Sequence, residues 1–193
     1  MAEGPGRALR SDAAQNRARL LLAARRLFAE RGHAVPLEDV AREAGVTRAT
    51  LYRHFPTRED LVVTVFDENI RMIERRAAEL ADRDDAVIEL FDLVLSVQRD
   101  DRALPHVLNW ADPAWFADLV ERTKAVFEPL LERGLRAGLV HPGVDVDDIM
   151  LVFPMATGAI TDNERQGRIL MHDRVQTLLH RALFTQEPPP PER

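Results

Sequence analysis

The chain has 193 residues, of which 46% are hydrophobic and 30% are charged, and its formal net charge is -6. It contains no cysteine, which excludes disulfides, thiol nucleophiles and thiolate zinc sites. A chain of this length is expected to bury a core as one or two domains. No apolar stretch is long enough for a membrane span, and the N-terminal residues lack the apolar region of a secretory signal, so we expect a cytoplasmic protein without a membrane partner.

Apolar residues recur at three-to-four spacing along almost the whole chain, which predicts an all-α fold of about nine helices. A disordered N-terminal tail is expected over residues 1–11, which are polar and contain Gly and Pro. A second is expected over residues 187–193, because four successive prolines there exclude a helix.

Three helices are predicted at the start of the ordered part of the chain. The first ends at Gly32, and the second begins near Pro36. Gly45 supplies the positive φ of a tight turn, and Thr47 is a good N-cap for the third helix. A glycine turn between the last two of three short helices is the helix-turn-helix pattern.

The later helices are placed by their N-terminal sequences. The fourth starts at the capping-box-like sequence from Thr57 to Asp60 and reaches about Leu80. Further helices begin near residues 83–85, 112–113, 145–148 and 161–164. Pro129 is expected to kink or split the helix that runs from residue 113 to Gly138.

Charge is distributed unevenly between the two parts of the chain. Residues 1–58 carry 11 Lys and Arg against six Asp and Glu, a net of +5, whereas residues 59–193 carry 15 against 26, a net of -11. This asymmetry is typical of a polyanion-binding head on an acidic body, although chance along an Arg-rich and Asp-rich chain also produces it.

The third helix is the candidate site for a polyanion. A DNA major groove admits one helix, whose N-terminal side chains reach base edges while later residues bond phosphates. On a helical wheel with Leu51 facing inward, the third helix presents seven candidate contact residues at its N-terminal end and along its outer side, and the start of the fourth helix adds one more. The candidates are Thr47, Arg48, Ala49, Thr50, Tyr52, Arg53, His54 and Arg58. A merely solvated helix face has the same residue types, so spacing alone leaves both interpretations open.

The segment from Arg19 to Leu61, with the run VAREAGVTRATLYRHF at its centre, resembles the N-terminal DNA-binding domain of the TetR family of bacterial transcriptional regulators. The resemblance implies a homodimer that binds a double-stranded DNA operator, with a ligand pocket and a dimer interface in the C-terminal helices. Carried over by position, the implied DNA contacts are Thr47, Arg48, Ala49, Tyr52 and His54, with Arg58 on a phosphate. Family members often have paired threonines at the start of the second helix, where this chain has Pro36 and Leu37, and Glu38 cannot replace the phosphate contact usual there.

A second candidate site lies between Leu104 and Phe116, where two tryptophans combine with polar side chains. This composition is typical of a small-molecule cavity, and also of plain helical core. We expect a small apolar or amphipathic effector there. The candidate lining residues are Phe91, His106, Asn109, Trp110, Trp115, Phe116, Phe127 and Met150.

Catalytic and metal sites are not expected. The six histidines form no HExxH motif and no i, i+4 pair, and neither Ser11 nor Ser96 lies in a nucleophile elbow. Acidic pairs lie at helix starts, where the helix dipole explains them. We therefore expect no enzyme activity, no cofactor and no metal ion.

These expectations describe a ligand-responsive repressor that a small molecule releases from a palindromic operator. The helix-turn-helix domain would cover residues 12–58, and a regulatory and dimerisation domain would cover residues 59–186. Within the latter, the faces of residues 145–160 and 164–184 are predicted to pack against their symmetry mates. A constitutive regulator without an effector is the alternative.

Overall fold

The computed structural model describes residues 5–32, 34–100, 112–159 and 165–186. These residues form eight helices, and their only β pairing is an isolated antiparallel bridge between Val140 and Phe184. The predicted all-α fold is therefore confirmed. Within the described ranges, no helix combines the length and the hydropathy that crossing a membrane requires.

The described helices fall into two compact units, an N-terminal unit that ends at Glu68 and a C-terminal unit that begins at Asn69. This boundary lies inside α4 (Arg58–Leu80), whereas the sequence-based division was placed at its start, between residues 58 and 59. Leu61 and Val65, in the first turns of α4, are buried but do not belong to the core of the C-terminal unit. Their burial explains why the start of α4 groups with the helices before it.

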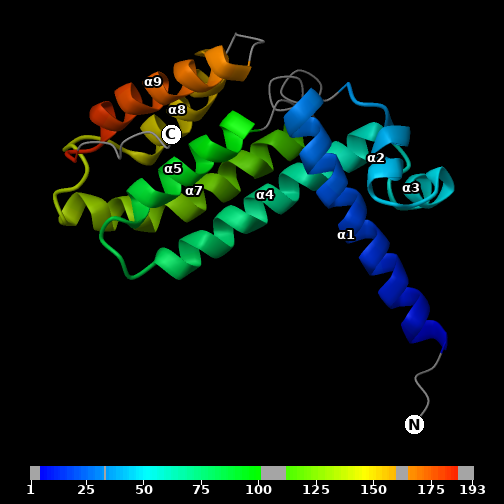
Figure 1. Cartoon of the computed structure of the whole chain (residues 1–193). Coiled ribbons are helices and arrows are strands. Elements are labelled where there is room, and N and C mark those ends of the chain that lie inside the picture. The colour runs from blue at the N-terminus through cyan, green and yellow to red at the C-terminus, as the bar shows by residue number, and fades with distance from the viewer. Residues whose placement is uncertain (1–4, 33, 101–111, 160–164, 187–193) are drawn as a thin grey trace. The chain divides into compact units, whose positions relative to one another are not determined.

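In the N-terminal unit, α1 packs against both α2 and α3 (Figure 1). The core between them is apolar and includes Leu20, Phe28 and Leu51. The bounds of the three helices are Pro5–Arg31 for α1, Leu37–Glu43 for α2 and Arg48–His54 for α3. The predicted tail over residues 1–11 is thus helical from Pro5 onward, because proline suits the first turn of a helix and Arg, Ala and Leu follow it.

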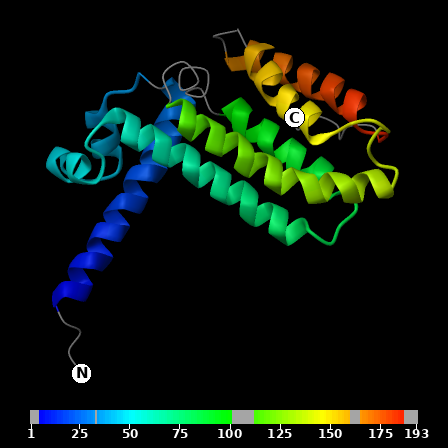
Figure 2. The same ribbon diagram turned by 180° about the vertical axis from the view of Figure 1, so that it is seen from behind.

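In the C-terminal unit, α5 packs on α7, and α8 packs on α7 and α9; both views show these neighbours side by side (Figures 1 and 2). Four phenylalanines form the centre of its core. The ring of Phe91 lies 5.8 Å from that of Phe153 and 5.2 Å from that of Phe184, and Phe127 lies 5.6 Å from Phe153. The helix bounds are Ala86–Asp100 for α5, Pro113–Arg136 for α7, Val146–Ala159 for α8 and Arg165–Leu183 for α9.

Two of the predicted helix starts have the expected caps. Asp112 accepts a hydrogen bond from the backbone N–H of Ala114 at 2.7 Å, which opens α7. At the start of α8, the backbone N–H of Asp145 donates to the Asp148 carboxylate at 3.1 Å, and the backbone N–H of Asp148 donates to the Asp145 carboxylate at 3.0 Å. The helix start predicted over residues 161–164 and the tail over 187–193 lie outside the described residues.

Pro129 does not split its helix, because α7 continues through it to Arg136. The proline lies on the exposed side, so the carbonyl that loses its helical partner can be reached by water. On the opposite side, Phe127 and Leu130 are buried in the core. Packing of that face offsets the missing hydrogen bond and keeps the helix whole.

Gly134 allows α7 to approach α5 closely. A Cβ atom there would lie 2.8 Å from Cγ1 of Val87 and 2.9 Å from Cγ2 of Val140, both on stiff, buried side chains. Overpacking of this kind costs about 1–3 kcal/mol, more than the roughly 1 kcal/mol that alanine gains over glycine in a helix. We expect Gly134→Ala to lower the free energy of unfolding by denaturant. A rise, as at an open helix position, would contradict this packing.

Candidate nucleic-acid interface

The turn between α2 and α3 is fixed by backbone geometry. Gly45 has a φ of 65°, a conformation that favours glycine. Its N–H donates to the carbonyl of Arg42 at 3.1 Å, and the N–H of Val46 donates to the carbonyl of Ala41 at 3.0 Å. This bond pair is the Schellman motif, which ends a helix and turns the chain sharply. The predicted role of Gly45 is confirmed.

The start of α3 is fixed by its cap. The hydroxyl of Thr47 accepts a hydrogen bond from the backbone N–H of Thr50 at 3.1 Å, as an N-cap does. The two threonine hydroxyls also share a hydrogen bond of 2.9 Å. On the inner side of α3, Leu51 is buried, as is Phe55 at the C-cap. The cap and the buried side chains together fix which face of α3 is turned to solvent.

All eight predicted contact residues lie at the surface of the N-terminal unit. Exposed side chains belong to Thr47, Arg48, Ala49, Tyr52 and Arg53, and half-buried ones to Thr50, His54 and Arg58. Seven of them come from α3 and its cap, and Arg58 opens α4. At that second helix start, Thr57 and Asp60 exchange hydrogen bonds through their backbone N–H groups at 3.0 and 3.1 Å.

Arg48, the first residue of α3, is held by two neighbours. Its Nη2 lies 3.0 Å from Oε1 of Glu38 on α2, and its guanidinium lies 5.4 Å from the centre of the Tyr52 ring. The hydrogen bond with Tyr52 and the attraction of Glu38 raise the pKa of Arg48 above its ordinary value. The guanidinium thus lies between a carboxylate and an aromatic ring at the N-terminal end of α3.

Two features of this surface were not predicted from the sequence. Arg17 of α1 places its guanidinium 5.5 Å from the ring centre of Phe55, near the C-terminal end of α3. Glu38 was considered only as a poor phosphate contact, whereas it is the ion-pair partner of Arg48. Both contacts join different helices, so no local sequence pattern signals them.

The predicted effector residues do not meet in one described cavity. Phe91 and Phe127 are buried in the phenylalanine core, while Trp115 is half-buried and Phe116 is 39% exposed at the start of α7. Met150 is partly buried against the core of the C-terminal unit. The other three candidates, His106, Asn109 and Trp110, lie outside the described residues.

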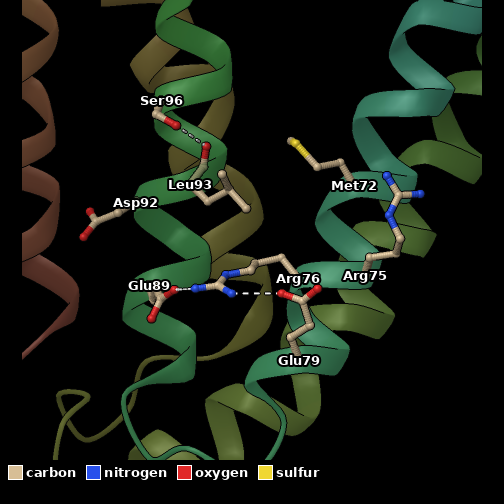
Figure 3. Close-up of a pocket in the computed structure, with 8 residues that line it drawn as sticks. All are labelled: Met72, Arg75, Arg76, Glu79, Glu89, Asp92, Leu93 and Ser96. Carbon is tan, nitrogen blue, oxygen red and sulfur yellow. Dashed lines mark hydrogen bonds and ion pairs between the residues drawn. The ribbon is translucent and has the colours of Figure 1, made fainter. Parts of the chain in front are cut away.

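A different concave site, called the α4–α5 groove below, lies between α4 and α5 and has a volume of about 520 Å³ (Figure 3). Met72 and Leu93 point toward each other across it, and Arg76 reaches across to Glu89. Asp92 turns away toward α9, where Gln176 donates a hydrogen bond of 2.9 Å to its carboxylate. Burial raises the pKa of Asp92, although that hydrogen bond acts in the opposite direction.

The outer sides of α8 and α9 carry large apolar residues without cover in the single chain. On α8, Leu151 is 60% exposed and Met155 is exposed as well; on α9, Leu178 is 59% exposed and Met171 is exposed. These four residues are called the α8–α9 apolar face below. They lie within the two segments that the sequence predicted as the dimer contact.

Comparisons with known proteins agree with this geometry. The model of the family "Bacterial regulatory proteins, tetR family" matches residues 20–65, which include α2, the turn and α3. The crystal structure of a TetR transcription regulatory protein from Mycobacterium vanbaalenii is 30% identical to the chain with a TM-score of 0.66. That similarity covers 92% of this chain and 99% of the other.

Among curated proteins, the HTH-type transcriptional regulator CymR of Pseudomonas putida is 25% identical over 180 residues, which are 91% of this chain and 83% of CymR. An HTH-type transcriptional regulator of Staphylococcus aureus is 29% identical over 106 residues, or 52% of this chain. The chain spans little more than half the length of that relative, at 57%.

Proposed function

Because the chain belongs to the tetR family of bacterial regulatory proteins, which are DNA-binding transcriptional regulators, we propose that it is a repressor released from a palindromic operator by a small molecule. Regulators of this family bind DNA, act as dimers and are not enzymes. The observation that carries the proposal is the short, capped α3, which turns its inner face to the core and its Arg48 and Tyr52 to solvent.

In this proposal, α3 enters the major groove with its N-terminal end toward the bases. Arg48 reads the base edge of a guanine, because its planar fork matches the O6 and N7 acceptors. Tyr52 and His54 lie farther along the helix and hold phosphate oxygens, as does Arg58 at the start of α4. The other four candidates, Thr47, Ala49, Thr50 and Arg53, complete the contact surface.

The proposed homodimer forms through the α8–α9 apolar face. A two-fold contact places the same surface of each copy against the other, so two helices per chain make a four-helix contact. Leu151 and Leu178 support it, since large side chains that are more than half exposed gain free energy when a partner covers them. Two linked copies also present two reading helices to the two halves of a palindrome.

The effector would act by a population shift. It would bind better to a state in which the two reading helices are spaced wrongly for the operator, so that its binding weakens DNA binding. The alternative of a constitutive regulator is favoured by one observation: Phe91 and Phe127 pack in the core and do not line the groove between α4 and α5.

We expect a small apolar or amphipathic molecule to bind near the start of α7, to change tryptophan emission and to weaken operator affinity. Phe116→Ala should then weaken effector binding, by up to the roughly 1.5–3 kcal/mol of a buried aromatic side chain. Leu93→Gln, in the α4–α5 groove, is the matched control and should leave effector affinity unchanged.

The opposite pattern, in which Leu93→Gln abolishes the response and Phe116→Ala does not, would move the effector to the α4–α5 groove. A broad ligand screen that changes neither the emission nor the DNA affinity would support the constitutive regulator instead.

The proposed DNA recognition is tested by selection of bound sequences from a pool of random duplexes. We expect a palindrome whose half-sites lie about one helical turn of DNA, or a multiple of it, apart. A pool that shows no enriched sequence after selection would contradict sequence-specific recognition by α3.

A further inference from the structure

Three carboxylates on α2 each form an ion pair with an arginine of the N-terminal unit. Asp39 pairs with Arg31 on α1 at 3.3 Å and with Arg42 on α2 itself. Glu43 pairs with Arg26 on α1 at 2.9 Å, and Glu38 pairs with Arg48 at 3.0 Å. Among these described pairs, that of Glu38 is the one that reaches α3. Two of the carboxylates therefore tie α2 to α1, while the third acts on the proposed reading helix.

The pair between Glu38 and Arg48 contributes little to folding. The two side chains are 47% and 66% exposed, and solvent screens the attraction between exposed charges. Helix α2 is already held by its buried residues Leu37, Val40 and Ala41. A carboxylate beside a DNA-binding helix also repels phosphate, which weakens binding to any duplex. The dipole of α2 favours a carboxylate in its first turn, but it does so for Asp39 as well as for Glu38, so it does not explain why Glu38 is placed against Arg48.

We propose that Glu38 is a specificity-determining residue, which positions Arg48 for a base edge and disfavours its use as a phosphate contact. The proposal rests on the proposed function, in which α3 reads the operator. Glu38 on one side and the Tyr52 ring on the other favour one position of the guanidinium at the helix start, by the small free energy of an exposed pair. A fork with a preferred position suits bidentate contact with a base, whereas an arginine without one can reach phosphates on any sequence.

Repulsion by the Glu38 carboxylate weakens the complex with every duplex by about the same factor, so repulsion alone leaves the ratio of the two affinities unchanged. The ion pair with Arg48 changes that ratio, because it withholds the guanidinium from phosphates, which every duplex has, more than from the base edge that only the operator offers. Glu38 thus lowers non-specific affinity more than specific affinity. The measurable consequence is the ratio of the two affinities.

The test compares Glu38→Gln with Glu43→Gln, which removes the same charge from the same helix but breaks an ion pair of Arg26, which keeps its pair with Glu30, rather than that of Arg48. Affinities for the selected operator and for a scrambled duplex are measured at one salt concentration with the full chain. With Glu38→Gln we expect the scrambled duplex to bind about two- to fivefold more tightly, the scale of an exposed ion pair. Operator affinity should not rise, so the ratio falls. Glu43→Gln should change both affinities by the same factor.

Salt dependence supplies a second readout. If Arg48 becomes a phosphate contact in Glu38→Gln, the salt dependence of binding to the scrambled duplex should steepen by up to about one unit of slope. A ratio that changes equally in Glu38→Gln and Glu43→Gln would overturn the proposal, because charge alone would then explain both.

An Arg48→Ala background separates positioning from other effects. In this background Glu38→Gln should no longer change the ratio of the two affinities, since Arg48, the residue that Glu38 positions, is absent. A ratio that still falls in this background would overturn positioning through Arg48. If the unmodified protein shows no preference for any duplex, the proposed function itself fails, and this is seen before any variant is measured.

Discussion

Replacing Arg48 by alanine is expected to lower affinity for the selected operator by about 1–3 kcal/mol and affinity for a scrambled duplex much less. The reason is the position of this side chain. Arg48 begins α3, extends into solvent and is held between Glu38 and Tyr52. A side chain at the N-terminal end of a reading helix reaches base edges, and its loss is felt only where the correct base is present.

Tyr52→Phe is the matched comparison on the same helix. It removes the hydroxyl proposed to hold a phosphate, together with that hydroxyl's hydrogen bond to Arg48, and keeps both the ring that Arg48 lies against and the ion pair of Arg48 with Glu38. We expect it to weaken binding to both duplexes about equally, because phosphates carry no sequence information. Both variants must be measured at one stated salt concentration, since phosphate neutralisation makes every affinity depend on salt. Equal losses on both duplexes for Arg48→Ala would reduce Arg48 to a phosphate contact, and no loss would remove it from the interface.

The double variant Leu151→Asp, Leu178→Asp is expected to abolish the dimer. Both side chains are more than half exposed in the single chain, so the variant leaves the core intact, while burying charges between two copies is strongly unfavourable. Sedimentation should change from twice the 21.9 kDa of one chain to the single-chain mass. Operator affinity should fall by about 10²–10⁴, because two linked reading helices bind with avidity that one lacks.

Leu22→Asp is the control for this variant. Leu22 is 70% exposed on α1, so the substitution introduces the same charge at an exposed leucine outside the α8–α9 apolar face. It should leave the dimer intact. A dimer that survives the double substitution, or one that Leu22→Asp breaks, would contradict the proposed interface. An unmodified protein that sediments only as a single chain at micromolar concentration would contradict the homodimer itself.

The helix-turn-helix could be predicted from the sequence because its signals are local. Gly45 and Thr47 fix the turn and the cap through bonds to residues at most five positions away in the chain. The apolar spacing that places Leu51 and Phe55 inside is equally local. Such features need no knowledge of the rest of the fold, so both the helix bounds and the exposed face of α3 follow from the sequence.

Features that depend on tertiary packing were predicted less well. The burial of Phe127 and Leu130 keeps α7 whole through Pro129, and local propensity alone favoured a break. The pair between Glu38 and Arg48 joins two helices whose relative position only the folded chain defines. For the effector site, aromatic composition does not separate core from cavity: Phe91 lies in the core, whereas Phe116 is partly exposed.

The most direct test of sequence-specific binding by a dimer is a titration of the selected palindrome with the full chain, compared with a scrambled duplex at the same salt concentration. The proposal predicts two chains per palindrome and an affinity at least about 10³ times that for the scrambled duplex. Equal affinity for the two duplexes, or saturation at one chain per palindrome, would contradict it.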